Sequence, residues 1–186
     1  MNLTLDFELN IDPSLMDREE IIFPEKGSYS VMVNTPVIER YLRIRYDVSG
    51  LALKVFNGRG NYKIKATDSE WPWGAVPLER AIIIQNLFAV DHLAPRVYGI
   101  ASINGFVSQV VEYVDQTLPY SDRQHAVRMK AFEDIMNKYD IITIKDGDYG
   151  GWWNWRGNKL VDFSHFNFRI PASEPITPRE PTHGSF

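Results

Sequence analysis

The sequence predicts an α+β protein, with a larger N-terminal lobe built on a sheet and a smaller C-terminal lobe. Residues 51–56 (LALKVF) form the apolar run that is typical of a buried strand. Residues 78–93 are apolar on most faces of a helix, which indicates a helix that is largely buried. Residues 122–139 have the spacing of an amphipathic helix. Strands on both sides of one buried helix, followed by a second helix, favour this arrangement.

The first part of the chain predicts two strands before residue 51. Residues 1–24 mix short apolar stretches with acids, so we expect an irregular or capping segment there. Residues 29–33 are expected to form a strand after a turn. Residues 39–46 alternate partly between apolar and polar side chains, which predicts a second strand.

The middle of the chain predicts a helix and a hairpin. The helix over residues 78–93 begins near Glu79 and should end before Pro95. Residues 96–103 and 105–114 are strand-like and are joined by Asn104-Gly105, a dipeptide that is typical of tight hairpin turns.

The last third predicts one helix and short strands. The helix over residues 122–139 should bury one side, formed by Val127, Met129, Phe132, Ile135 and Met136. Short strands are expected at residues 141–144 and 159–163, with a loop rich in glycine between them. We divide the chain into an N-terminal lobe (1–114), a reduced C-terminal lobe (115–170) and a proline-rich tail (171–186).

Composition limits the classes of function. The 186 residues are 44% hydrophobic and 24% charged, which fits a globular protein of one domain or two small lobes. A net charge of −4 gives no basic field, so we expect neither a nucleic-acid partner nor a membrane partner. The start of the chain lacks the pattern of a secretory signal. The absence of cysteine excludes disulfides and thiolate metal sites and leads us to expect a cytoplasmic protein.

Acids and amides gather late in the chain, within the segment DGDYGGWWNWRGNKLVDF. They are Asp146, Asp148, Asn154 and Asp162. Their oxygen atoms are the donors that Mg²⁺ prefers. Much earlier, Lys54 stands alone inside an apolar strand. A lysine in a buried strand, followed by Asp, Asn and Asp in that order, indicates a site for a magnesium nucleotide.

The ordered set of motifs resembles the protein-kinase-like fold, including its aminoglycoside-phosphotransferase branch. Residues 51–54 (LALK) are similar to the third-strand motif whose lysine holds the nucleotide phosphates. Residues 110–114 (VVEYV) resemble the last strand before the hinge that contacts adenine. Residues 148–154 resemble the catalytic loop, and residues 161–164 (VDFS) resemble the metal-binding Asp-Phe-Gly element. The resemblance implies an antiparallel N-terminal sheet with one buried helix and a reduced C-terminal lobe.

The resemblance also implies a binding site for ATP and Mg²⁺. Lys54 would hold the phosphates, and Glu112 would lie at the adenine hinge. Gln85 would stand near the position of the glutamate that pairs with the lysine in this family. The partner is then a nucleotide, together with a phosphoryl acceptor that the sequence does not identify.

The same resemblance assigns the chemistry of the late cluster. Asp148 would orient the hydroxyl of the acceptor, with Asp146 as a rival for that role. Asn154 and Asp162 would hold the magnesium ion. Because Asp162 stands inside an apolar stretch, we expect its carboxyl group to be partly buried.

Several functions remain open. The first is a minimal phosphotransferase that acts on a small molecule or an unusual protein site. The second is a pseudokinase-like interaction module, favoured by Gln85 in place of an acid and by a single glycine, Gly27, where the family has several. The third is an unrelated α+β domain whose acids are loop residues. A reduced C-terminal lobe would expose apolar surface, so we also expect that the chain can form homo-oligomers.

Each candidate residue also has a structural interpretation. Lys54 could protect an edge strand against aggregation. Gln85 and Asn86 could satisfy backbone groups inside a buried helix. Asp148 could be a turn residue. Two aromatic sets are expected to pack the small lobe, and for the tryptophans the alternative is a stacking platform for a sugar or base. They are Trp152, Trp153 and Trp155, and Phe163, Phe166 and Phe168.

Overall fold

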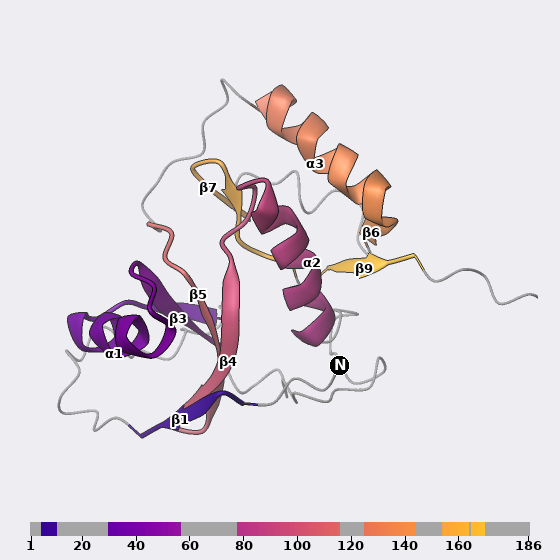
Figure 1. Cartoon of the computed structure of the whole chain (residues 1–186). Coiled ribbons are helices and arrows are strands. Elements are labelled where there is room, and N and C mark those ends of the chain that lie inside the picture. Colours follow the sequence, from indigo (N-terminus) through magenta and orange to yellow (C-terminus); the bar gives the residue numbers. More distant parts are fainter. Residues whose placement is uncertain are drawn as a thin grey trace, which may run out of the picture.

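A computed structural model describes residues 5–10, 30–56, 78–115, 125–143, 154–163 and 165–169. Within these ranges helices and strands are mixed, so the α+β prediction is confirmed (Figure 1). In chain order the elements are β1 (Phe7–Leu9), β2 (Ser30–Val33), α1 (Pro36–Tyr46), β3 (Leu51–Phe56), α2 (Leu78–Val90), β4 (Val97–Ile103), β5 (Phe106–Glu112), α3 (His125–Tyr139), β6 (Ile141–Thr143), β7 (Trp155–Arg156), β8 (Lys159–Leu160) and β9 (Phe166–Phe168).

The main sheet has five strands in the order β1-β4-β5-β3-β2. The pairs β2–β3, β3–β5 and β4–β5 are antiparallel, as predicted. The expectation of a wholly antiparallel sheet is wrong at one edge, where β1 runs parallel to β4. The amide of Asp6 donates to the carbonyl of Ile100, and the amide of Asn104 donates to the carbonyl of Leu9. Part of the segment expected to be irregular is therefore a strand.

Residues 36–46 form a helix, so the strand expected at residues 39–46 is wrong. Thr35 caps the helix, since its Oγ1 accepts a hydrogen bond from the amide of Ile38 at 3.2 Å. Pro36 occupies the first turn, where its missing N–H costs nothing. The two buried side chains of the helix, Ile38 and Leu42, are four residues apart. That spacing is the period of a helix, and the partial alternation around it is misleading.

The two faces of the main sheet are covered by different helices. Helix α1 packs its buried residues against Leu51, Leu53 and Val55 of β3. Helix α2 packs Leu78 and Ile82 against the opposite face. Figure 1 shows α1 and α2 on either side of the strands. Because β3 alternates its side chains, Lys54 lies on the face that α2 covers.

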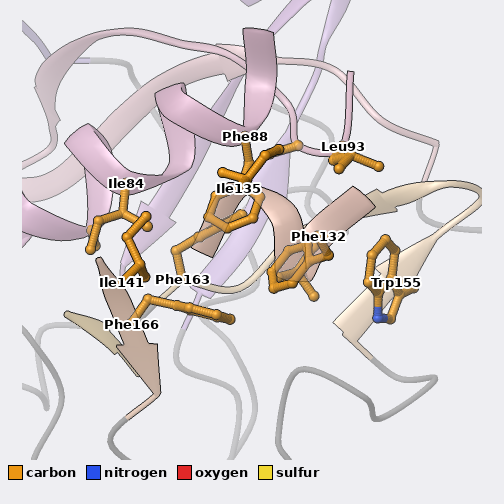
Figure 2. Packing of buried hydrophobic residues seen from close by; sticks show 12 residues of the cluster. Ile84, Phe88, Leu93, Phe132, Ile135, Ile141, Trp155, Phe163 and Phe166 are labelled. Atoms are coloured by element: carbon orange, nitrogen blue, oxygen red, sulfur yellow. The ribbon is translucent and has the colours of Figure 1, made fainter. Parts of the chain in front are cut away.

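The other side of α2 forms a second core with the C-terminal elements (Figure 2). The rings of Phe88 and Phe132 stack with their centroids 4.2 Å apart. Phe163 and Phe166 are buried in this cluster and Phe168 packs against it, so their predicted packing role is confirmed. Helix α2 therefore joins the main sheet to the small C-terminal sheets.

Other predicted elements differ from the structure in length or at single residues, and the strand expected at residues 159–163 extends only over β8 (Lys159–Leu160). The hairpin turn between β4 and β5 has Asn104 at φ 48° and Gly105 at φ 82°, as the dipeptide predicts. Val127 is 74% exposed, so its expected place on the buried side of α3 is wrong. The tail, residues 171–186, lies outside the described residues. None of the helices in the described ranges has the length and apolar character needed to cross a membrane.

Candidate functional site

Lys54 lies in the interior of the main sheet. Its strand, β3, pairs with β2 on one side and β5 on the other, so the interpretation as an edge-strand lysine is wrong. The side chain is partly buried, and its Nζ lies 5.6 Å from the centre of the Phe56 ring. The ammonium donates a hydrogen bond to the backbone carbonyl of Val161 at 2.9 Å. This bond joins residues 107 positions apart in the sequence.

The electrostatic state of Lys54 depends on burial and on one acid. Burial lowers the pKa of Lys54, because the charged ammonium loses contact with water. The carboxylate of Asp162 acts in the opposite direction and raises this pKa. Asp162 is itself partly buried, as its apolar neighbours in the sequence predict. The lysine and the acid therefore lie close enough to influence each other.

A short hairpin brings the backbone of Asn154 next to Val161. Strands β7 and β8 pair antiparallel around a turn in which Gly157 has φ 58°. At the open end of this hairpin, the amide of Val161 donates to the carbonyl of Asn154 at 2.9 Å. Val161 thus contacts Asn154 through its amide and Lys54 through its carbonyl, and Asp162 follows it directly.

Packing holds the segment that carries Asp162 on both sides. Before it, the amide of Leu160 donates to the carbonyl of Leu93 at 2.8 Å. After it, the ring of Phe163 lies 5.5 Å from that of Phe88 on α2. Two anchors within four residues leave Asp162 little freedom to move away from Lys54.

Glu112 occupies the end of β5 and contacts the C-terminal hairpin. Its carboxylate forms an ion pair with Lys159 of β8. Its other oxygen accepts a hydrogen bond from the amide of Arg96 at 3.3 Å. The side chain thus connects the end of β5 to the hairpin, and its expected place at an adenine site stays a prediction.

The side chain of Gln85 forms a hydrogen bond with the backbone. It is 2% exposed, and its Nε2 donates to the carbonyl of Pro95 at 2.6 Å. The neighbouring Asn86 pairs with Val97 through both a donor and an acceptor, at 3.0 and 2.8 Å. Both amides fit the structural interpretation. The structure shows no hydrogen bond between Gln85 and Lys54.

The two aspartates proposed for catalysis, Asp146 and Asp148, lie outside the described residues, as do Trp152 and Trp153. Trp155 is 1% exposed inside the second core, which supports its packing role. Among the residues that the structure describes, there is no cluster of three or more acids and histidines suited to a metal ion.

Two buried polar residues were not singled out by the sequence. Gln109 lies on β5 directly opposite Lys54 and is 2% exposed. Arg128 of α3 is 6% exposed and donates to the carbonyl of Gly157 in the hairpin turn at 2.9 Å. A lone glutamine within an apolar strand was the available signal for the first. Arg128 lies in a helix with the pattern of an amphipathic helix, whose polar residues are expected to face solvent, so the sequence does not indicate that it is buried.

No protein-family model matches the chain, and no curated protein is significantly similar to it.

Proposed function

We propose that the chain is a kinase-like protein that binds Mg–ATP and transfers its phosphoryl group to a small molecule or an unusual protein site. The observation that carries the proposal is the contact of Lys54 with Val161, beside Asp162. A partly buried ammonium next to a carboxylate offers a cation for phosphates and a ligand for a metal.

The order of the elements supports a kinase-like fold. The lysine stands on β3, which is followed by the buried helix α2 and then by the hairpin of β4 and β5. In protein kinases the phosphate-binding lysine lies on a strand followed by a helix that packs behind it. The chain then continues through α3 to the hairpin that precedes Asp162, in the order that the resemblance implies.

The donor atoms fit magnesium bound together with a nucleotide. Asp162 offers a carboxylate and Asn154 an amide oxygen, and both are hard donors. In nucleotide sites Mg²⁺ uses one or two protein carboxylates and completes its shell with phosphate oxygens and water. Two protein donors are therefore enough, and the bound ion would neutralise charge on the phosphates.

An anionic ligand would also remove an electrostatic cost from the protein. Burial disfavours the charged form of Lys54, and Asp162 alone only partly compensates. Phosphate oxygens beside the ammonium would favour its charged form and share its hydrogen bonds. Nucleotide binding is therefore expected to raise the pKa of Lys54, and the protonated lysine is expected to bind the nucleotide more tightly.

A second candidate is a pseudokinase-like interaction module that does not transfer phosphate. It is favoured by Gln85, whose amide is bound to Pro95 at the place where the family carries an acid for the lysine. Such a module could bind the nucleotide and act through its surface on a partner protein.

Thermal stability in the presence of ATP tests nucleotide binding. With Mg²⁺, ATP should stabilise the wild type by about 2.7 kcal/mol at roughly 100 times its Kd. The variant Asp162→Asn should lose the part that depends on Mg²⁺, whereas Asp134→Asn, on the exposed side of α3, should keep it. Absence of any shift with every nucleotide tried would contradict both candidate functions.

Turnover separates the two candidates. A phosphotransferase should consume ATP with an acceptor, and the activity should be lost in Lys54→Ala and Asp148→Ala but kept in Asp146→Ala. Stabilisation by Mg–ATP without turnover for any acceptor would favour the interaction module.

A further inference from the structure

A polar pair lies within an apolar row of the main sheet. Across the strands, Met32 of β2 is opposite Lys54, Lys54 is opposite Gln109 of β5, and Gln109 is opposite Ile100 of β4. Opposite residues of antiparallel strands point to the same face. Met32 and Ile100 belong to the apolar cluster beneath α2, so the lysine and the glutamine are polar groups in an apolar layer.

Gln109 carries an acceptor that is not used. Its side chain is buried, and its Oε1 has no hydrogen-bond partner among the described residues. An acceptor buried without a partner is costly, so buried side-chain amides are ordinarily satisfied. The position is therefore unfavourable in the protein alone, and a donor is needed to satisfy it.

We propose that Gln109 is the positioning residue of Lys54, and that its Oε1 accepts a hydrogen bond from the ammonium when Mg–ATP is bound. The inference rests on the proposed function and deepens it. It replaces the sequence-based expectation that Gln85 has this place.

The chemistry of the ammonium fits this role. A lysine ammonium has three donors, and in the structure one of them goes to the carbonyl of Val161. A phosphate oxygen would take a second donor. Side chains directly opposite on antiparallel strands have Cβ atoms about 4.5–5.5 Å apart, so the amide of Gln109 can reach the third. The ammonium would then be held from β5, from the segment before Asp162 and from the nucleotide.

A neutral partner has a consequence for the charge of the site. An acid at this position would pair with Lys54 and compete with the phosphates for it. The amide orients the ammonium and leaves its full charge to the phosphates. Gln85 is engaged elsewhere, because its Nε2 donates to the carbonyl of Pro95.

Two buried glutamines with equal exposure provide a matched comparison. Calorimetric titration of the full chain with Mg²⁺ and a non-hydrolysable ATP analogue should be carried out on the wild type, Gln109→Met, Gln109→Glu and Gln85→Met. The Gln109→Met variant keeps the length of the side chain and removes the acceptor, so its affinity should fall about tenfold. The Gln109→Glu variant restores an acceptor but competes with the phosphates for Lys54, so its affinity should lie between those of Gln109→Met and the wild type.

The remaining outcomes decide the proposal. In Gln85→Met the affinity should stay within about twofold of the wild type, while the free energy of unfolding falls because the carbonyl of Pro95 loses its donor. Unchanged affinity in Gln109→Met would overturn the assignment, and so would a loss confined to Gln85→Met. A wild type that binds no nucleotide would instead remove the proposed function, and this inference with it.

Discussion

Lys54 is the residue on which the account depends, and its position has a measurable cost. The ammonium lies in a partly buried site with one carbonyl partner at 2.9 Å. Burial lowers its pKa, and Asp162 opposes the shift without cancelling it. Keeping the ammonium charged at this position therefore lowers the free energy of unfolding. Proteins tolerate such a cost mainly at sites with a function.

The pH dependence of stability should reveal this lysine. Its pKa in the folded protein is lower than in the unfolded chain, so the unfolded chain binds more protons between that lowered pKa and about pH 10.5. The free energy of unfolding should then rise with pH towards that value, by at most about 1.4 kcal/mol per pH unit. Lys54→Met should lack this increment and be more stable at pH 7. Urea titrations of both proteins between about pH 7 and 9.5 measure it. Parallel curves would contradict the lowered pKa.

At the level of residues, the sequence identifies the unusual charged side chains but not the groups that contact them. Lys54 and Asp162 stand out because charges inside apolar strands need compensation. Their common neighbour, Val161, acts through its backbone, which no residue type reveals. Gln109 was missed because its importance depends on the register that places it opposite Lys54.

Among the elements, β1 is held in place by contacts remote in sequence. The carboxylate of Asp6 accepts hydrogen bonds from the amide of Ile100 and the hydroxyl of Tyr46, both at 3.1 Å. Burial, followed by the charge of Asp6, raises the pKa of Tyr46 to about 12. The approach is possible because residue 99 is glycine, since a Cβ there would lie 1.8 Å from Oδ2 of Asp6.

Substitution of this glycine should detach the strand. In Gly99→Ala the carboxylate of Asp6 must move, so the free energy of unfolding should fall by about 1–3 kcal/mol. The pKa of Tyr46 should fall towards 10.0 as it loses the carboxylate. Denaturant unfolding and the difference in absorbance titration between each protein and its Tyr46→Phe counterpart measure these effects. In an Asp6→Ala background Gly99→Ala should cost less, because only the Tyr46 hydroxyl, 2.6 Å from the added Cβ, is left to move. An equal cost would show that the clash is not with Asp6.

The raised pKa of Tyr46 also predicts how the stability of the protein changes in alkaline solution. Because the pKa of Tyr46 is raised in the folded protein, its contribution is complete below about pH 10 and is lost as the pH rises towards about 12. The Tyr46→Phe variant should not show this loss. Identical alkaline unfolding of the two proteins would contradict the raised pKa.

The sequence predicts long or strongly patterned elements and misses short or context-dependent ones. The helix α2 and the hairpin of β4 and β5 follow from local pattern and turn chemistry. Strand β1 has three residues and forms by pairing with β4, so no local sequence pattern predicts it. For α1 the capping residue Thr35 was the signal that the partial alternation obscured.

For the whole molecule, α2 is the element that couples the two parts of the chain. One side of it packs on the main sheet, and the other forms the core with α3 and the C-terminal strands. The division of the chain at residue 114 stays a prediction. Association of copies of the chain stays a prediction.

Unfolding should accordingly be a single transition. Phe88 is fully buried and stacks on Phe132, so Phe88→Ala should lower the free energy of unfolding by about 3–5 kcal/mol. Tryptophan fluorescence, to which Trp155 in the second core contributes together with the other four tryptophans, and far-UV circular dichroism should shift together. Separate transitions by the two probes would show that the parts unfold independently.

The most direct test of the central claim is a crystal structure of the chain with Mg²⁺ and a non-hydrolysable ATP analogue. The account predicts phosphate oxygens within hydrogen-bond distance of Lys54 Nζ and a magnesium ion bound by Asp162. Nucleotide bound elsewhere, with Lys54 still on the carbonyl of Val161 and no metal at Asp162, would contradict it.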